Sequence, residues 1–191
     1  PPEEKLDSIR AWLQQDSNYA TAAYMPFFDH HFNRYVTTNQ LDSAAQLLVL
    51  VGEVCYQKDV YDSILVQKYL DFLPKYEKAN PQIVLRAGLY RILAEFYVLK
   101  EMYEKAIATY KKNDFTPQDY NTADEVGWSY CGLAGTYRII AQYDSSILYG
   151  QKAMQCFEAR EDDAGKSAVY SNLASVYRRI GDYQEAEKCA L

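Results

Sequence analysis

Two adjacent histidines are the residues of this 191-residue chain most suited to hold a metal or transfer a proton. They are His30 and His31, and the chain has no other histidine. Neighbouring side chains on a helix point about 100° apart, whereas a histidine metal pair needs positions i and i+4 on one face. The pair therefore predicts surface or capping residues of an N-terminal helix, without a metal or catalytic role.

A Gly-Lys-Ser sequence occurs within "AREDDAGKS", residues 159–167. A phosphate-binding P-loop needs a glycine five positions before its last glycine, where this chain has Arg160, and it needs a preceding strand. This region is helical by pattern, so we expect a loop and a helix start, with Asp162 or Asp163 near the helix N-terminus. The acidic run at 161–163 predicts a solvated loop and no paired catalytic carboxylates.

The four cysteines form no CxxC pair, and their spacings fit no zinc site. We expect free and mostly buried thiols, with an inter-helix disulfide as the open alternative, and this is a weak indication of a reducing compartment. They are Cys55, Cys131, Cys156 and Cys189. No Ser/His/Asp or Cys/His set can be assembled, so the chain is expected to be a binding protein without a cofactor, and not an enzyme.

Composition indicates long helices packed along tyrosine-rich seams. Glycine (8) and proline (6) are scarce, which argues against a many-turned β fold, and 19 tyrosines suit half-buried helix contacts. The net charge of −6 disfavours nucleic-acid binding by this fragment, because phosphate backbones need a basic surface. No run of about 18 apolar residues is present, so we expect no membrane insertion by this fragment.

A pattern of tyrosine, leucine and alanine recurs every 40 residues. The first four columns fall at i, i+3, i+4 and i+7, which is one stripe of a helix, and the fifth column begins a second helix. The columns are Tyr90/Tyr130/Tyr170, Leu93/Leu133/Leu173, Ala94/Ala134/Ala174, Tyr97/Tyr137/Tyr177 and Tyr103/Tyr143/Tyr183. Each copy therefore predicts a helical hairpin, and the three copies predict a tandem array.

The strongest copy, "VYSNLASVYRRIGDYQEAEKCAL", resembles the tetratricopeptide repeat (TPR) superfamily. It has the family pattern at Tyr170, Leu173, Ala174, Tyr177, Gly181, Tyr183, Ala186 and Ala190. The 40-residue period is similar to the TPR variants of kinesin light chains and of bacterial sensor and regulator proteins. This resemblance covers residues 81–191 and implies an all-α fold, a right-handed α-α superhelix of the TPR-like solenoid type. The first pattern position is Tyr where the family has Trp, and only the last copy keeps the turn glycine.

We expect a single solenoid domain over residues 1–191. It has degenerate helical pairs in 1–80 and clear repeats from 87, 127 and 167, the last one truncated. Proline is expected to open or kink a helix at Pro26 and to mark helix starts at Asn80-Pro81 and Thr116-Pro117. The expected helices lie near 3–15, 26–38, 41–57, 60–73, 81–100, 103–112, 117–141, 143–159, 163–180 and from 183 onward.

The candidate binding surface lies on the helix side opposite the packing stripe. In the TPR family this side lines the concave groove that binds peptides, and we transfer that role by position only. The transferred residues are Arg91, Glu95, Trp128, Arg138, Ser171, Asn172, Arg178 and Arg179. Four arginines against one glutamate form a basic strip on an acidic chain, which predicts a protein or peptide partner with an acidic or carboxylate group. Plain surface solvation of Arg178 and Arg179 is the alternative.

Trp128 lies beside Gly132 and Gly135 in this strip. Small residues next to a tryptophan predict a shallow pocket with an aromatic wall. Packing of Trp128 under the neighbouring helix is the alternative.

Two functions remain open for such a module. The first, implied by the resemblance, is the N-terminal sensory part of a bacterial signalling regulator of the histidine kinase or helix-turn-helix type. The second is a free-standing scaffold or adaptor that assembles partner proteins. The chain stops inside its last helix without a polar cap, so we expect the native protein to continue after Leu191. Localisation is unknown, and an extracytoplasmic domain of a membrane-anchored protein is favoured over a cytoplasmic one.

Overall fold

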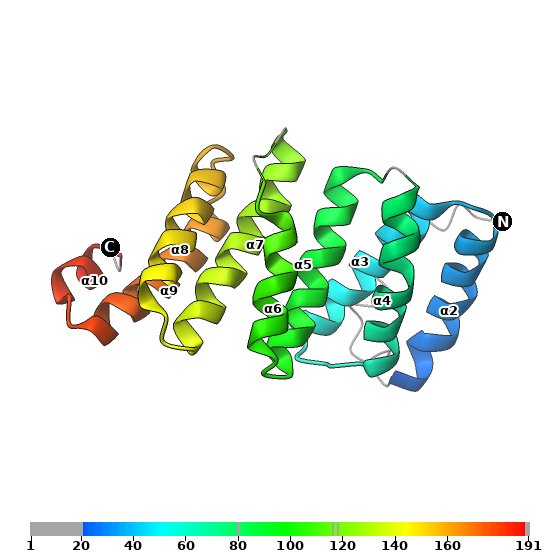
Figure 1. The fold of residues 1–191 in the computed structure, drawn as a ribbon, viewed down its shortest axis with the longest axis horizontal. Coiled ribbons are helices and arrows are strands. Elements are labelled where there is room, and N and C mark those ends of the chain that lie inside the picture. The colour runs from blue at the N-terminus through cyan, green and yellow to red at the C-terminus, as the bar shows by residue number, and fades with distance from the viewer. Residues whose placement is uncertain (1–20, 80, 116, 118, 190–191) are drawn as a thin grey trace. The chain divides into compact units, whose positions relative to one another are not determined.

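The structure is a computed structural model that describes residues 21–79, 81–115, 117 and 119–189. Within these ranges the regular elements are all helices (Figure 1). They are α2 (Thr21–Thr37), α3 (Leu41–Gln57), α4 (Ser63–Lys78), α5 (Ile83–Leu99), α6 (Tyr103–Tyr110), the short 3₁₀ helix η2 (Lys111–Asn113), α7 (Tyr120–Ile139), α8 (Tyr143–Glu158), α9 (Asp163–Ile180) and α10 (Tyr183–Lys188). The expected all-α class is confirmed. The chain divides into two compact units, Pro1–Leu93 and Ala94–Leu191.

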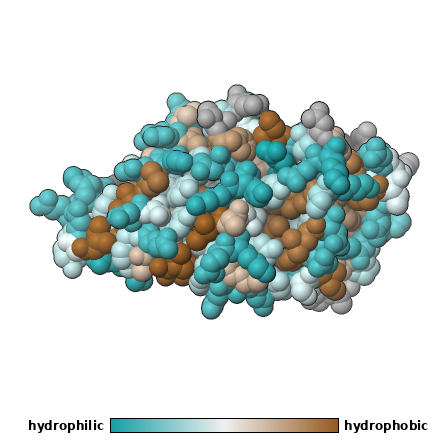
Figure 2. Space-filling view, viewed as in Figure 1, coloured by the Kyte–Doolittle hydropathy of each residue, from teal (hydrophilic) through white to brown (hydrophobic). Residues whose placement is uncertain are grey.

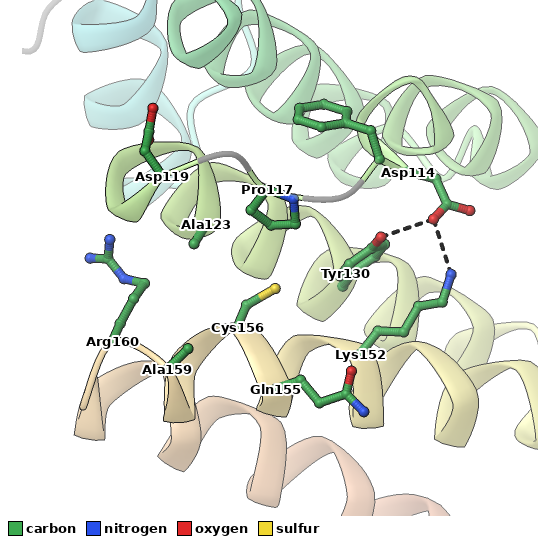
Figure 3. Close-up of a pocket in the computed structure, with 11 residues that line it drawn as sticks. Asp114, Pro117, Asp119, Ala123, Tyr130, Lys152, Gln155, Cys156, Ala159 and Arg160 are labelled. Atoms are coloured by element: carbon green, nitrogen blue, oxygen red, sulfur yellow. Dashed lines mark hydrogen bonds and ion pairs between the residues drawn. The ribbon is translucent and has the colours of Figure 1, made fainter.

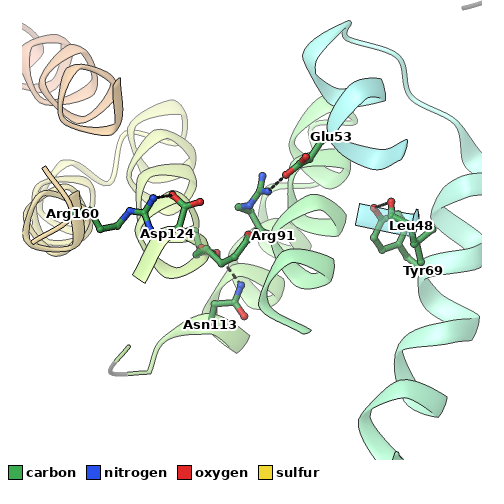
Figure 4. Close-up of polar contacts among 9 residues, drawn as sticks. Leu48, Glu53, Tyr69, Arg91, Asn113, Asp124 and Arg160 are labelled. Carbon is green, nitrogen blue, oxygen red and sulfur yellow. Dashed lines mark hydrogen bonds and ion pairs between the residues drawn. The ribbon is translucent and has the colours of Figure 1, made fainter. Parts of the chain in front are cut away.

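Helices α3 and α4 meet closely in the first unit, at a glycine. A β-carbon on Gly52 would overlap the Tyr69 side chain and the Ile92 methyl group, so packing requires glycine at this position. The Tyr69 ring is fully buried, and its hydroxyl donates to the Leu48 backbone carbonyl at 2.7 Å (Figure 4). This hydrogen bond satisfies a polar group that would otherwise be costly to bury.

The second unit has its core along α7, and the predicted packing stripe is found there. Tyr130, Leu133, Ala134 and Tyr137 are all buried. They pack with buried residues of α6, α8 and α9, among them Tyr110, Tyr149, Phe157 and Leu173. The Tyr137 and Tyr149 rings stack with centroids 5.6 Å apart, and Tyr130 lies 5.9 Å from Tyr149. The 40-residue pattern thus marks the side of α7 that faces the core.

The turn that closes the first helix of each copy keeps one geometry through three copies. Glu101, Ala141 and Gly181, spaced 40 residues apart, all have left-handed φ values of 56°, 58° and 84°. In each turn the residue after the left-handed one donates its backbone N–H to a tyrosine carbonyl at 2.9 Å. In the first copy Met102 donates to Tyr97 in this way. This is the Schellman pattern that often ends helices. The turn therefore forms without glycine in two copies, at a cost of about 1 kcal/mol for each β-carbon in this region.

Several helix boundaries differ from the predicted ones. Pro26 lies inside α2 and not at its start, and α4 continues past Pro74 to Lys78. Both prolines are exposed, so water can satisfy the backbone carbonyl that each one leaves without a donor. Helix α7 begins at Tyr120 instead of Pro117, because Asp119 and Thr122 form a capping box.

Some predictions lie outside the described residues or are not tested there. The expected helix at 3–15 and the caps at Asn80 and Thr116 fall on positions that the structure does not describe. The expectation of a single domain over 1–191 stays a prediction.

Candidate functional site

The predicted partner-binding residues of the second unit lie on α5, α7 and α9, and Asn172 marks where α9 contacts α7. Asn172 of α9 donates from its Nδ2 to the Cys131 Sγ of α7 at 3.6 Å. One turn further along α7, a β-carbon on Gly135 would lie 3.8 Å from the Asn172 side-chain oxygen, an ordinary contact distance. Ser171, next to Asn172, is exposed. We call the set Trp128, Arg138, Ser171, Asn172, Arg178 and Arg179 the α7–α9 strip.

The arginines of this strip lie in the last turns of their helices. Arg178 and Arg179 are exposed in the last turn of α9, and Arg138 is half-buried in the last turn of α7. Cations here interact favourably with the helix dipole, so part of their role is structural. The Arg138 Nε is buried without an acceptor among the described residues. A buried donor without an acceptor costs free energy, and a hydrogen bond to an acceptor would remove that cost.

Two predicted residues are engaged within the protein. Arg91, in the first unit, is half-buried and bonds the Glu53 carboxylate at 2.7 Å (Figure 4). Glu95, in the second unit, is buried, with only 7% of its surface exposed. Burial, and to a smaller extent the negative charge of Glu95, raise the pKa of the Cys131 thiol to about 11. Neither Arg91 nor Glu95 therefore presents an open charge to a partner.

The expected shallow pocket beside Trp128 is wrong at one of its two glycines. A β-carbon on Gly132 would overlap the buried Tyr110 ring, so Tyr110 already fills this space. Trp128 itself is half-buried and packs edge-on against Phe157, with centroids 5.0 Å apart. Of the two glycines, only Gly135 could carry a β-carbon without overlap, at an ordinary contact distance from Asn172.

A second candidate site, which the sequence did not indicate, is lined by described residues that precede α7, by α7 and by α8. Figure 3 shows Asp114 and Pro117 on one side of the cavity, Lys152, Cys156 and Ala159 on the other, and Tyr130 between them. Its volume is about 730 Å³, within the usual range of ligand pockets. We call it the loop pocket, and its lining residues are Asp114, Phe115, Pro117, Asp119, Ala123, Tyr130, Lys152, Gln155, Cys156, Ala159 and Arg160.

One end of the loop pocket contains an ion pair between Asp114 and Lys152. Asp114 Oδ1 accepts from the Tyr130 hydroxyl at 2.9 Å and from Lys152 Nζ at 3.0 Å. Burial alone would raise the pKa of Asp114, but hydrogen bonds from Lys152 and Tyr130 outweigh it and lower the pKa. Burial and then Asp114 raise the pKa of the Tyr130 phenol, which therefore stays protonated. The Lys152 ammonium also lies 5.1 Å from the centres of the Tyr130 and Tyr149 rings.

The other end of the loop pocket holds a second ion pair. Arg160 Nη2 lies 3.2 Å from an Asp124 oxygen (Figure 4), and the guanidinium is mostly buried. Asp119 is exposed and accepts from the Thr122 backbone N–H at 2.8 Å, so it serves as a helix cap. Each charged group of this pocket thus has a partner of its own.

No group of three metal-binding side chains occurs among the described residues, and no described helix is long and apolar enough to cross a bilayer. The four cysteines are free, and Cys55, Cys131 and Cys156 are buried, as expected. On the face shown in Figure 2, hydrophobic residues form small groups separated by hydrophilic ones. Small scattered groups of this kind are usual on a protein surface.

Comparisons with known proteins agree with the repeat pattern. Residues 125–190 match the family described as tetratricopeptide repeat. Over 108 residues, 56% of this chain, the sequence is 29% identical to the transcriptional activator NprA of Geobacillus stearothermophilus, and the match covers 26% of that protein. The crystal structure of BtubC (BKLC) from P. vanneervenii superposes with a TM-score of 0.57 at 15% identity, covering 97% of this chain and 88% of that one.

Proposed function

Because this chain is a member of the tetratricopeptide repeat superfamily, we propose that it is a protein- or peptide-binding module whose α7–α9 strip receives an acidic partner. The observation that carries this proposal is the pair of exposed arginines, Arg178 and Arg179, in the last turn of α9. They lie on a chain whose net charge is −6, so they form a local basic surface in an acidic field. We assign the chain no enzymatic role.

Three further groups of the strip suit a polypeptide. The exposed Ser171 hydroxyl can donate or accept, and the Asn172 carboxamide has an oxygen and a second N–H beyond its bond to Cys131. Gly135 is half-buried and has no side chain, so a main chain can come close to the α7 backbone there. The half-buried Arg138 guanidinium can donate to a carboxylate through its exposed part. Together these groups supply both charge recognition and backbone recognition.

We propose a sensory role in a bacterial signalling regulator, supported by the similarity to a transcriptional activator. The chain spans about a quarter of that relative, so the output function belongs to this proposal and not to the match. Binding of a partner that prefers one arrangement of the repeats would shift their equilibrium and so bias an attached output domain.

The binding experiment uses a fluorescent peptide rich in glutamate and its glutamine counterpart. Anisotropy of each peptide is followed as the chain is added. We expect the glutamate peptide to bind and the Arg178→Ala/Arg179→Ala variant to bind it at least about tenfold more weakly, since each lost charge-assisted bond is worth about 1.5 kcal/mol or more when partly desolvated.

The matched control is Lys75→Ala/Lys78→Ala. This change also removes two exposed cations from the last turn of a helix, here α4. It should leave the affinity unchanged. Equal binding of both peptides, or undiminished binding by the arginine variant, would reject the strip as the binding site.

The regulator role has a separate test in the reading frame around this chain. A kinase or helix-turn-helix module in the same frame supports the sensory role. A frame without an output module rejects it and favours the scaffold or adaptor function, which keeps the same binding strip.

A further inference from the structure

We propose that the loop pocket is a second binding site, which receives an uncharged peptide segment of a partner protein through one backbone peptide unit and one apolar side chain. This site is separate from the α7–α9 strip and takes a ligand of different chemistry. Its residues come from positions 114, 115, 117 and 119, from α7 and from α8 with the turn that follows it.

The polar end of the pocket offers one acceptor and one set of donors side by side. Tyr130 and Lys152 both donate to the same oxygen of Asp114, Oδ1, which leaves Oδ2 to accept from a ligand. A lysine ammonium has three N–H donors, and only one of them is used by Asp114. A peptide unit has one N–H and one carbonyl oxygen, so it can bond Oδ2 and Nζ together.

The charge balance of the pocket selects against a charged ligand. The lining has two acidic residues, Asp114 and Asp119, and two basic residues, Lys152 and Arg160. A ligand carboxylate at the polar end would meet Asp114, and a ligand ammonium would meet Lys152. A neutral peptide unit avoids both repulsions and keeps the Asp114–Lys152 ion pair intact.

The walls between the charged ends are apolar. The Tyr130 ring, Ala123 and Cys156 are buried, and Pro117 and Ala159 complete the lining near them. Burial raises the pKa of the Cys156 thiol, so it stays uncharged at neutral pH. Small side chains at Ala123 and Ala159 leave room for a side chain of the ligand. This surface suits an aromatic or branched aliphatic residue.

The direct test is NMR titration of the ¹⁵N-labelled chain with three N-acetylated tripeptides. They are acetyl-Gly-Phe-Gly-amide, the same peptide with a free C-terminal carboxylate, and acetyl-Gly-Gly-Gly-amide. We expect saturable shifts of the Lys152, Cys156 and Ala159 amides with the first peptide, with a Kd in the millimolar range. The carboxylate should bind at least about fivefold more weakly, and the triglycine peptide should cause no saturable shift.

Variants locate the site. Ala159→Phe fills the pocket from an exposed position after α8 and should abolish the shifts. Ala164→Phe, the same change at an exposed position in the first turn of α9, should bind as the unchanged chain does. Lys152→Met keeps most of the aliphatic stem but removes the ammonium, and it should weaken binding about fivefold or more.

Three results would overturn the proposal. One is equal or tighter binding of the carboxylate peptide, and another is undiminished binding by Ala159→Phe. The third is binding of acetyl-phenylalanine-amide without binding of the tripeptide, because it would mean a small-molecule site closed to a peptide chain. None of these results bears on the α7–α9 strip, whose test uses acidic peptides and arginine variants.

Discussion

The α7–α9 strip and the loop pocket share helix α7 but treat charge in opposite ways. In the strip, Arg178 and Arg179 are exposed at the end of α9. In the pocket, Lys152 and Arg160 are each held by a carboxylate, Asp114 or Asp124. An open charge attracts an acidic partner over distance, whereas a closed ion pair provides local donors and acceptors with little net field. The difference shows that counting charged residues on a surface does not predict what binds there.

The largest expected effect comes from α7 itself, since this helix supports both sites. Gly132→Ala places a methyl group into the buried Tyr110 ring, and overpacking of this kind costs about 2 kcal/mol. The urea midpoint of unfolding should fall, and binding at both sites should weaken together because the helix must shift.

Gly135→Ala is the matched control for that change. Its added methyl group meets only Asn172, at 3.8 Å. We expect a gain of roughly 0.5 kcal/mol, because alanine is the better residue inside a helix. If Gly132→Ala is as stable as the unchanged chain, Tyr110 does not fill the space that the structure assigns to it.

The second prediction separates the sites by ionic strength. Between about 50 mM and 500 mM salt, binding of the glutamate peptide at the strip should weaken by roughly tenfold, because exposed charges are screened. Binding of the neutral tripeptide at the loop pocket should change less than about twofold. Anisotropy and NMR titrations at the two salt concentrations measure this. A pocket affinity that falls as steeply as the strip affinity would contradict the assignment of a neutral ligand.

The third prediction concerns the hydroxyl that anchors the pocket. Tyr130→Phe keeps the ring but removes the bond to Asp114, with an expected loss of about 1 kcal/mol in unfolding free energy. The affinity of the strip for the glutamate peptide should not change. Tyr143→Phe, on the half-buried first residue of α8, removes a hydroxyl elsewhere and serves as the control. Equal stability of Tyr130→Phe and Tyr143→Phe would show that the hydrogen bond from Tyr130 to Asp114 contributes nothing to the unfolding free energy.

The smallest expected effect is a pH dependence confined to the pocket. The folded-state pKa of Asp114 is lowered, so its contribution to stability is present above the unfolded pKa of about 3.9 and is lost as pH falls through the folded value. Asp114→Asn should therefore lose stability relative to the unchanged chain at pH 6, and this difference should shrink toward pH 2. Thermal melts across this range measure it. The Arg178→Ala/Arg179→Ala variant leaves the Asp114 hydrogen bonds in place, so its difference in stability should stay constant over this range.

The helical repeat could be predicted from the sequence because it depends on periodicity. The stripe of Tyr130, Leu133, Ala134 and Tyr137 is buried as predicted, since residues spaced at i, i+3, i+4 and i+7 must share one face of a helix. Helix ends were harder to predict. Pro117 indicated a start, but the capping box of Asp119 and Thr122 decided it, because backbone N–H groups need acceptors.

Of the candidate sites, only the strip could be predicted, and only by position. The rule that selected Arg178 and Arg179 also selected Arg91 and Glu95. Yet Arg91 is paired with Glu53, and Glu95 is buried. A helical pattern states which residues share a face but not what the next helix places against it. The same limit applies to Gly132 and Gly135, which were both expected to border a shallow pocket. In the structure Tyr110 fills the space at Gly132 but not at Gly135.

The sequence by itself determined the all-α class, the 40-residue hairpin and the side of α7 that faces the core. These depend on local spacing, which a single chain segment contains in full. Only the tertiary structure decided where Tyr110 lies, which arginines are open and that a pocket exists. The loop pocket joins Asp114 to Lys152, which are 38 positions apart, and no local pattern encodes a meeting that depends on how α7 and α8 pack. The left-handed turns at Glu101 and Ala141 also depend on tertiary structure, because packing of the hairpin outweighs the preference for glycine at these positions.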